Sequence, residues 1–210
     1  MDSPDCYRQY SDFLTRTIGC VCLVVIQTQQ HALKKNKDRK MNHKEHDCNK
    51  NLIKSFGTLS ANIAQNHHRQ NVAEFVFHDI CSSDMLNINK AAYFVNNADF
   101  KILKGVVGYH QHDAFAQGNC WQNPEQFNSH MQNNAQFHQK VRNVEQDSID
   151  MSNKKQIFKL ADHLELAKPV VHTWNMKYDN QGIILFEQPE HDEHNHICQV
   201  APLLSFCSVF

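Results

Sequence analysis

The chain has 210 residues, of which 41% are hydrophobic and 20% charged, the balance of a globular protein rather than of a disordered or fibrous one. Its formal net charge of -1 supplies no overall attraction to nucleic-acid phosphates or to anionic lipid, so neither nucleic acid nor a membrane is expected as a partner. The eight cysteines form no C-x-x-C pair and are interpreted as reduced thiols of a cytoplasmic protein.

The N-terminal residues 1–40 are predicted to be an appendage to the folded domain. The apolar run 18–26 within them is too short for a membrane-spanning helix. Residues 27–50 are rich in lysine and nearly free of apolar side chains, which is typical of a solvated linker. Met41 lies inside this linker, so residues 1–40 either precede the true translation start or form a segment docked through a mobile connection. Residues 41–210 are predicted to form a single domain.

Two helices and a hairpin are expected after the linker. Apolar residues recur at helical spacing over 51–65 and again over 72–81, although the second stretch could also be a strand. Two apolar runs at 91–95 and 100–109 flank a group of turn-forming residues. This arrangement predicts a β-hairpin.

The C-terminal half repeats this pattern of helices followed by a hairpin. Helical spacing predicts helices over 123–145 and 153–167. The runs 170–178 and 182–188 are rich in β-forming residues and are joined by turn residues, which predicts a second hairpin. Because the hairpins do not form a regular βα repeat, the expected fold class is α+β with an antiparallel sheet.

Clustered histidines suggest a metal site. His110 and His112 follow the second run of the first hairpin, and on a continuing strand their imidazoles would point to the same side. That arrangement can chelate zinc, iron or copper. Two imidazoles are too few for such a site, so ligands distant in the sequence must join them. The candidates with suitable atoms are His78, Asp79, His191, His194 and His196.

Two further groups contain metal-ligand residue types. In the loop EHDEHNH, His191 and His194 would share a helical face, whereas His194 and His196 would share a strand face. The second group lies in the predicted linker and consists of His43, His46 and Cys48. The chain contains 15 histidines, and it is also rich in Asn and Gln. The competing interpretation is therefore that compositional bias, without selected chemistry, accounts for the histidines.

The stretch VAEFVFHDIC, residues 72–81, resembles the apolar helix ending in His-Asp of the HD-domain metal-dependent phosphohydrolases. This resemblance implies that His78 and Asp79 would ligate a metal together with an upstream histidine and a later aspartate. The following CSSDMLNINK departs from the usual continuation of the family, and the strands expected over 91–109 interrupt what would be helices there.

Other chemistry is less well supported by the sequence. Cys120 beside Trp121, or Cys81 near His78, could act as a nucleophile with a histidine base. His172 is expected to be a hydrogen-bonded core histidine. Three functions stay open: a transition-metal-binding protein, a non-enzymatic interaction or regulatory domain, and an HD-like metal-dependent phosphohydrolase.

Overall fold

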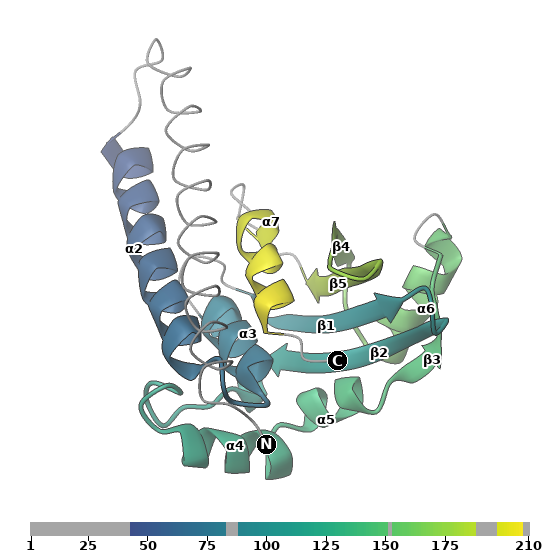
Figure 1. Ribbon diagram of the computed structural model, residues 1–210, viewed down its shortest axis with the longest axis horizontal. Helices are drawn as coiled ribbons and strands as arrows, with labels where there is room; N and C mark the ends of the chain where they lie inside the picture. Colours follow the sequence, from purple (N-terminus) through teal and green to yellow (C-terminus); the bar gives the residue numbers. More distant parts are fainter. Residues whose placement is uncertain (1–42, 83–87, 151–152, 188–196, 208–210) are drawn as a thin grey trace, which may run out of the picture. The chain divides into compact units, whose positions relative to one another are not determined.

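The computed structural model describes residues 43–82, 88–150, 153–187 and 197–207, which Figure 1 draws as coloured ribbons. Its contacts divide the chain into two compact units, residues 1–66 and 67–210. The separation of an appendage at residues 1–40 falls on residues outside the described ranges and stays a prediction.

The described part of the first unit is one helix, α2 (His43–Asn66). Leu59 and Ile63 are buried and Phe56 is half-buried, whereas most of the residues between them are exposed, so the apolar stripe has the predicted helical spacing. The helix predicted over 51–65 is confirmed. The linker predicted over 27–50 is wrong for residues 43–50, because Lys and Glu are good helix formers even where no apolar residue accompanies them.

The second unit is built on a five-stranded antiparallel sheet with the strand order β3-β2-β1-β5-β4. Both predicted hairpins are confirmed, and with them the α+β class. The strands are β1 (Lys90–Asn97), β2 (Ile102–His110), β3 (Glu145–Asp147), β4 (Pro169–Asn175) and β5 (Asn180–Glu187). The strand β3, which was not predicted, pairs only with the first three residues of β2.

Four helices of the second unit frame the sheet, and two shorter turns of helix close the described chain. They are α3 (Val72–Ser82), α4 (Pro124–Asn133), α5 (Gln136–Arg142), α6 (Lys154–His163), α7 (Ile197–Val200) and a 3-10 helix η2 (Ala201–Phe206). The strand alternative for 72–81 is wrong, since α3 is helical throughout. Among the described residues, no helix has the length and apolar character that crossing a membrane would require.

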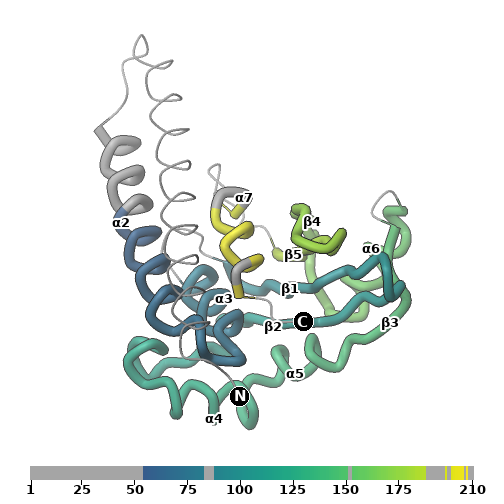
Figure 2. The backbone as a smooth tube through the Cα atoms, in the orientation of Figure 1, coloured from purple at the N-terminus to yellow at the C-terminus, as the bar shows by residue number. Residues whose placement is uncertain are grey.

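The single helix predicted over 123–145 is wrong, because the chain leaves the helical conformation at Ala135 (φ -81, ψ 79). The break produces two consecutive short helices, α4 and α5, which can be followed along the trace in Figure 2. The helix predicted over 153–167 ends early, at His163, where Glu165 takes a left-handed conformation (φ 56) and the N–H of Leu166 returns to the carbonyl of Ala161.

Each face of the sheet has its own cover. On one face, α5 and α6 enclose a core that includes Phe94, Val141 and Leu160. On the opposite face, the Phe77 ring of α3 stacks on Tyr93 with a centroid distance of 6.2 Å. The helix η2 also packs on this face, where Ser205 accepts a hydrogen bond from the indole of Trp174 at 2.7 Å.

A β-bulge in β2 decides how closely α5 approaches the sheet. Tyr93 pairs with Val107 and Phe94 pairs with Gly105, so Val106 is an extra residue without a partner on β1. The bulge puts Gly105 and Gly108 on the same face, beneath α5. A Cβ atom at Gly105 would lie 1.8 Å from the carbonyl oxygen of Val141, so only glycine allows this contact.

Candidate functional site

His78, one of the predicted metal ligands, fastens the loop 111–123 to α3. Its Nε2 atom accepts a hydrogen bond from the backbone N–H of Phe115 at 3.1 Å. The ring also makes edge-to-face contacts with Tyr109 and Phe127. Burial in these surroundings lowers the pKa of His78 to about 4, so the imidazole is neutral at physiological pH.

Asp79 fastens the same loop at a second point. Its Oδ2 atom accepts a hydrogen bond from the indole Nε1 of Trp121 at 2.9 Å. Burial raises the pKa of Asp79, and the hydrogen bond from Trp121 offsets part of that rise. The two members of the predicted dyad thus bind different residues of the loop, and the ligand role implied by the HD-domain resemblance stays a prediction.

His110 and His112 lie close together, although by a different conformation from the one expected. The strand does not continue past His110, because residues 111–113 form a 3-10 turn. The two rings are nevertheless in edge-to-face contact with a centroid distance of 5.1 Å. The Oδ2 atom of Asp113 lies 3.8 Å from His110 Nδ1 and accepts a hydrogen bond from the N–H of Phe137 in the first turn of α5.

The remaining predicted ligands are not brought to this pair by the described structure. Within the described ranges, no three or more His, Cys, Asp and Glu side chains form a group suited to hold a metal ion. Residues 188–196, with His191, His194 and His196, lie outside those ranges. The group of His43, His46 and Cys48 lies within helix α2 and not in a linker.

The other residues considered for chemistry lie in unreactive surroundings. Burial raises the pKa of the Cys120 thiol to about 12 and that of Cys81 well above its usual value, so both stay protonated and are poor nucleophiles. His172 is half-buried and stacks on Trp174. The expected hydrogen bond is absent at its Nε2 atom, which is buried without a partner among the described residues.

A different set of polar residues surrounds a cavity of about 660 Å³, which we call the Glu74–His138 cavity. It lies between α3, α4, α5 and the bulged part of β2, and its lining includes the small or apolar residues Ala73, Val106 and Cys207. The polar lining residues are Gln70, Asn71, Glu74, Lys104, Asn128, Gln132, His138 and Arg142. Its volume falls in the range of small-molecule sites.

The short β3 strand explains the orientation of His138. Since β3 pairs only with residues 102–104, the edge of β2 beyond Lys104 has no neighbouring strand among the described residues. Two side chains of α5 bond to backbone groups of this part of β2: His138 accepts from the N–H of Gly108, and Arg142 donates to the carbonyl oxygen of Val106. The N–H of Gly108 donates to Nδ1 of His138 at 3.3 Å, which places the remaining imidazole proton on Nε2.

Glu74 approaches this Nε2 atom from α3. Its Oε1 atom lies 3.7 Å from His138 Nε2, farther than a hydrogen bond reaches. Its Oε2 atom accepts from the side-chain amide of Asn71 at 3.2 Å, and the same amide donates to Asn128 at 2.7 Å. The carboxyl group is therefore held in place from the side away from His138.

Burial disfavours the charged forms of both Glu74 and His138. It raises the pKa of Glu74 and lowers the pKa of His138 to about 4, and the charge of Arg142 contributes to the second shift. The imidazole is neutral near pH 7, so no ion pair forms even though the two side chains are only 14% and 7% exposed. A polar molecule in the adjoining cavity could form hydrogen bonds with both groups, which they do not form with each other.

The positive charges of the cavity lie at its rim. Arg142 is exposed on α5, and its Nη1 atom donates to the carbonyl oxygen of the bulged Val106 at 3.4 Å. Lys104 forms an exposed ion pair of 3.6 Å with Glu145 of β3. The bulge therefore anchors a guanidinium group beside the cavity.

Glu74, His138 and Arg142 were not among the predicted site residues. Glu74 lies within residues 72–81, which also contain the His78-Asp79 pair, and His138 lies among the core positions of α5. The available signal was a polar residue at a position where helical spacing expects burial. That signal does not reveal which polar side chains share a cavity.

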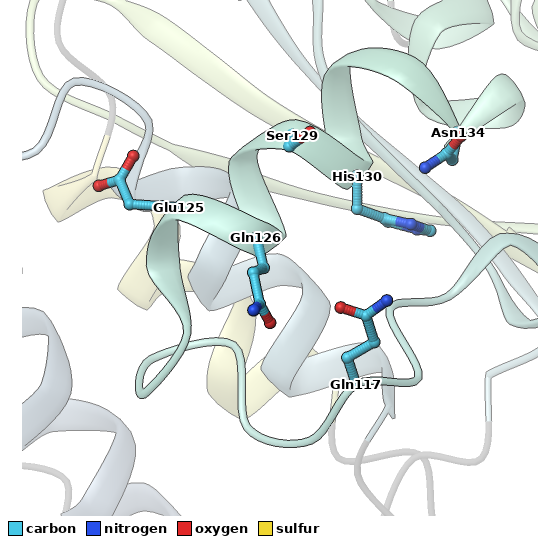
Figure 3. A pocket seen from close by; sticks show the side chains of 6 residues that line it. All are labelled: Gln117, Glu125, Gln126, Ser129, His130 and Asn134. Atoms are coloured by element: carbon cyan, nitrogen blue, oxygen red, sulfur yellow. The ribbon is translucent and has the colours of Figure 1, made fainter.

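A smaller hollow of about 340 Å³ lies between α4 and the loop that carries Gln117 (Figure 3). The amides of Gln117 and Gln126 face the same space, whereas Glu125 turns away from it. His130, which also lines the hollow, is engaged with the carbonyl oxygen of Asp113 at 2.7 Å. This hollow presents no pair of buried ionisable groups comparable to Glu74 and His138.

Comparisons of the chain with protein-family models, with curated proteins and with solved structures gave no match.

Proposed function

We propose that the unit of residues 67–210 is a binding domain for a small polar molecule, which it holds in the Glu74–His138 cavity. One observation carries the proposal: the Nε2 proton of His138 and the Oε1 atom of Glu74 face each other at 3.7 Å beside a cavity of about 660 Å³. Buried ionisable groups with shifted pKa values that line a cavity are typical of functional sites. This proposal is a specific form of the non-enzymatic interaction or regulatory domain that the sequence leaves open.

The experiment is a thermal-shift screen of the full chain with sugars, nucleosides, organic acids, amines and amino acids, followed by calorimetric titration of each hit. We expect at least one class to raise the unfolding temperature, because a ligand that binds only the folded state stabilises it by mass action. The rim variant Gln132→Trp should abolish the shift by blocking the cavity from an exposed position.

The matched control is Gln136→Trp, which places the same side chain at an exposed position outside the cavity lining. This variant should bind like the wild type. If no compound of any class stabilises the wild type, or if both tryptophan variants bind every hit unchanged, the cavity is not a binding site.

Transition-metal binding is a second candidate, favoured by the contact between the rings of His110 and His112 at 5.1 Å. Antiparallel pairing supports it as well. Lys90 pairs with His110, and the next residue, Ala91, pairs with Phe186. The C-terminal end of β5 and His110 therefore lie at the same end of the sheet. The sequence segment with His191 and His194 follows β5, and zinc or iron would need ligands from such a distant segment.

Dialysis of tag-free protein against zinc, iron or copper, followed by elemental analysis, tests the metal. We expect His110→Ala and His112→Ala each to abolish stoichiometric binding, whereas the exposed His163→Ala should not. Wild-type protein that takes up no metal would exclude this candidate and, with it, the HD-like phosphohydrolase.

A further inference from the structure

The charges around the Glu74–His138 cavity narrow the chemical class of its ligand, an inference that rests on the function proposed above. One acidic group, Glu74, lies at the inner wall, and one guanidinium, Arg142, lies at the rim. The second rim cation, Lys104, is already paired with Glu145 at 3.6 Å. The charge of Arg142 lowers the pKa of the Glu74 carboxyl group, but no ion pair joins the two side chains, so the cavity offers one acidic and one basic group that a ligand could bridge.

A ligand with a single charge suits this arrangement poorly. An anion would be repelled by the Glu74 carboxyl group and a cation by the Arg142 guanidinium, and each contact between like charges is energetically costly. A zwitterion avoids both costs, provided that its positive end lies at Glu74 and its negative end at Arg142.

The hydrogen-bonding groups agree with this orientation. The side-chain amide nitrogen of Asn71 already donates to Glu74 and to Asn128, so the Asn71 oxygen is left as an acceptor next to the acidic end. The Nε2 proton of His138 and the guanidinium of Arg142 are donors. Acceptors thus gather where an ammonium group would lie, and donors gather where a carboxylate would lie.

The apolar part of the lining indicates what else the ligand carries. Ala73, Val106 and Cys207 face the cavity without offering a strong hydrogen-bonding side chain. A cavity of about 660 Å³ has room for more than an ammonium and a carboxylate group. We propose that the Glu74–His138 cavity binds a free α-amino acid, with its ammonium group at Glu74, its carboxylate at Arg142 and its side chain against these apolar residues.

The test is calorimetric titration of the full chain with the twenty protein amino acids. It continues with L-phenylalanine and two analogues that each lack one charge, 2-phenylethylamine and 3-phenylpropionic acid. We expect at least one amino acid to bind in the micromolar to millimolar range, and phenylalanine to bind at least tenfold more tightly than either analogue. Glu74→Gln and Arg142→Gln should each weaken amino-acid binding about tenfold or more, because each removes one of the two charges.

Matched controls remove the same charges outside the cavity. Lys140→Gln lies on the same helix as Arg142 but is paired with Glu165, and Glu125→Gln lies on α4 outside the cavity lining. Both should bind amino acids like the wild type. Equal affinity for the singly charged analogues, or equal losses in the control variants, would overturn the amino-acid assignment.

The two proposals can fail separately. If the thermal-shift screen finds a sugar, a nucleoside or an organic acid whose binding Gln132→Trp abolishes, and no amino acid binds, the cavity is a binding site and the zwitterion assignment is wrong. If no compound binds, both proposals are wrong.

Discussion

Two buried histidines of this protein share their burial, their backbone hydrogen bond and their lowered pKa, but differ in what surrounds the rest of the ring. His78 and His138 are each about as buried as the other, each accepts a backbone N–H, and burial lowers the pKa of each to about 4. Around His78, the rings of Tyr109 and Phe127 fill the remaining space. Beside His138, the second nitrogen borders a cavity. The surroundings of that second nitrogen separate a structural histidine from a candidate binding group.

The largest expected effect is a fall of about 4 kcal/mol in the free energy of unfolding when the pH is lowered. The pKa values of both histidines are about 4 in the folded protein and near 6.5 in the unfolded chain, so between these values the unfolded chain binds the protons. The free energy of unfolding should therefore fall as the pH drops, by about 2 kcal/mol for each histidine at pH 5. The raised pKa values of Glu74 and Asp79 act in the opposite sense and return part of this loss.

Urea titrations at pH 7 and pH 5 measure the loss. His78→Gln and His138→Gln should each reduce the difference between the two pH values, and the double variant should nearly remove it. A wild-type protein with equal stability at both pH values would show that the two imidazoles are charged in the folded state or equally exposed in both states.

Truncation of His78 should lower the stability of the fold without changing binding in the cavity. His78→Ala leaves the N–H of Phe115 without its acceptor and opens a space among aromatic rings, so we expect a loss of about 3 kcal/mol in unfolding free energy. The ligands of the cavity should still bind the folded fraction. The exposed His163→Ala serves as the control and should change stability by less than about 0.5 kcal/mol.

A substitution at Gly108, beneath α5, should change the surroundings of His138 and leave those of His78 unchanged. A Cβ atom at Gly108 would lie 2.8 Å from Val141 Cγ2 and 3.0 Å from the carbonyl oxygen of Phe137, so Gly108→Ala should push α5 away from β2. We expect a loss of about 2 kcal/mol in stability together with weaker binding in the cavity. Chemical shifts of the His78 ring should stay as in the wild type, and a variant whose His78 signals move as much as those of His138 would contradict the separation.

The smallest expected effect belongs to Asp79. Asp79→Asn keeps an oxygen that can accept from Trp121 and removes a carboxyl group whose burial is unfavourable, so the unfolding free energy should change by less than about 1 kcal/mol. Urea denaturation followed by tryptophan fluorescence measures it. The HD-domain resemblance makes the contrasting prediction that this variant loses a bound metal.

Local sequence patterns account for much of the fold. The apolar spacing over 51–65 and 72–81 predicted α2 and α3, and the turn residues between apolar runs predicted both hairpins. The break between α4 and α5 was missed, because Asn134 and Ala135 include neither glycine nor proline and the chain turns there to pack Phe137 and Val141 on the sheet. The strand β3 was missed because three exposed residues show no apolar alternation.

The candidate site was much less predictable than the fold. His110 and His112 were expected to be close, and they are, because residues two apart along the chain can hardly separate. Glu74 and His138 come from different helices, and their meeting depends on the short β3, on the bulge at Val106 and on two glycines that admit α5. None of these has a signature that a single sequence displays.

The bulge at Val106 gives β2 two opposite phases of alternation. Before it, Leu103 and Gly105 point toward α5, and after it Gly108 and His110 do so, which a strict period of two would forbid. Deletion of Val106 would leave Gly105 and Val107 as consecutive residues of a regular ladder, so Tyr109 and His110 would keep their faces, but the carbonyl oxygen that accepts from Arg142 would be lost. The extra residue thus lets residues on both sides of the bulge face α5, although the alternation changes between them.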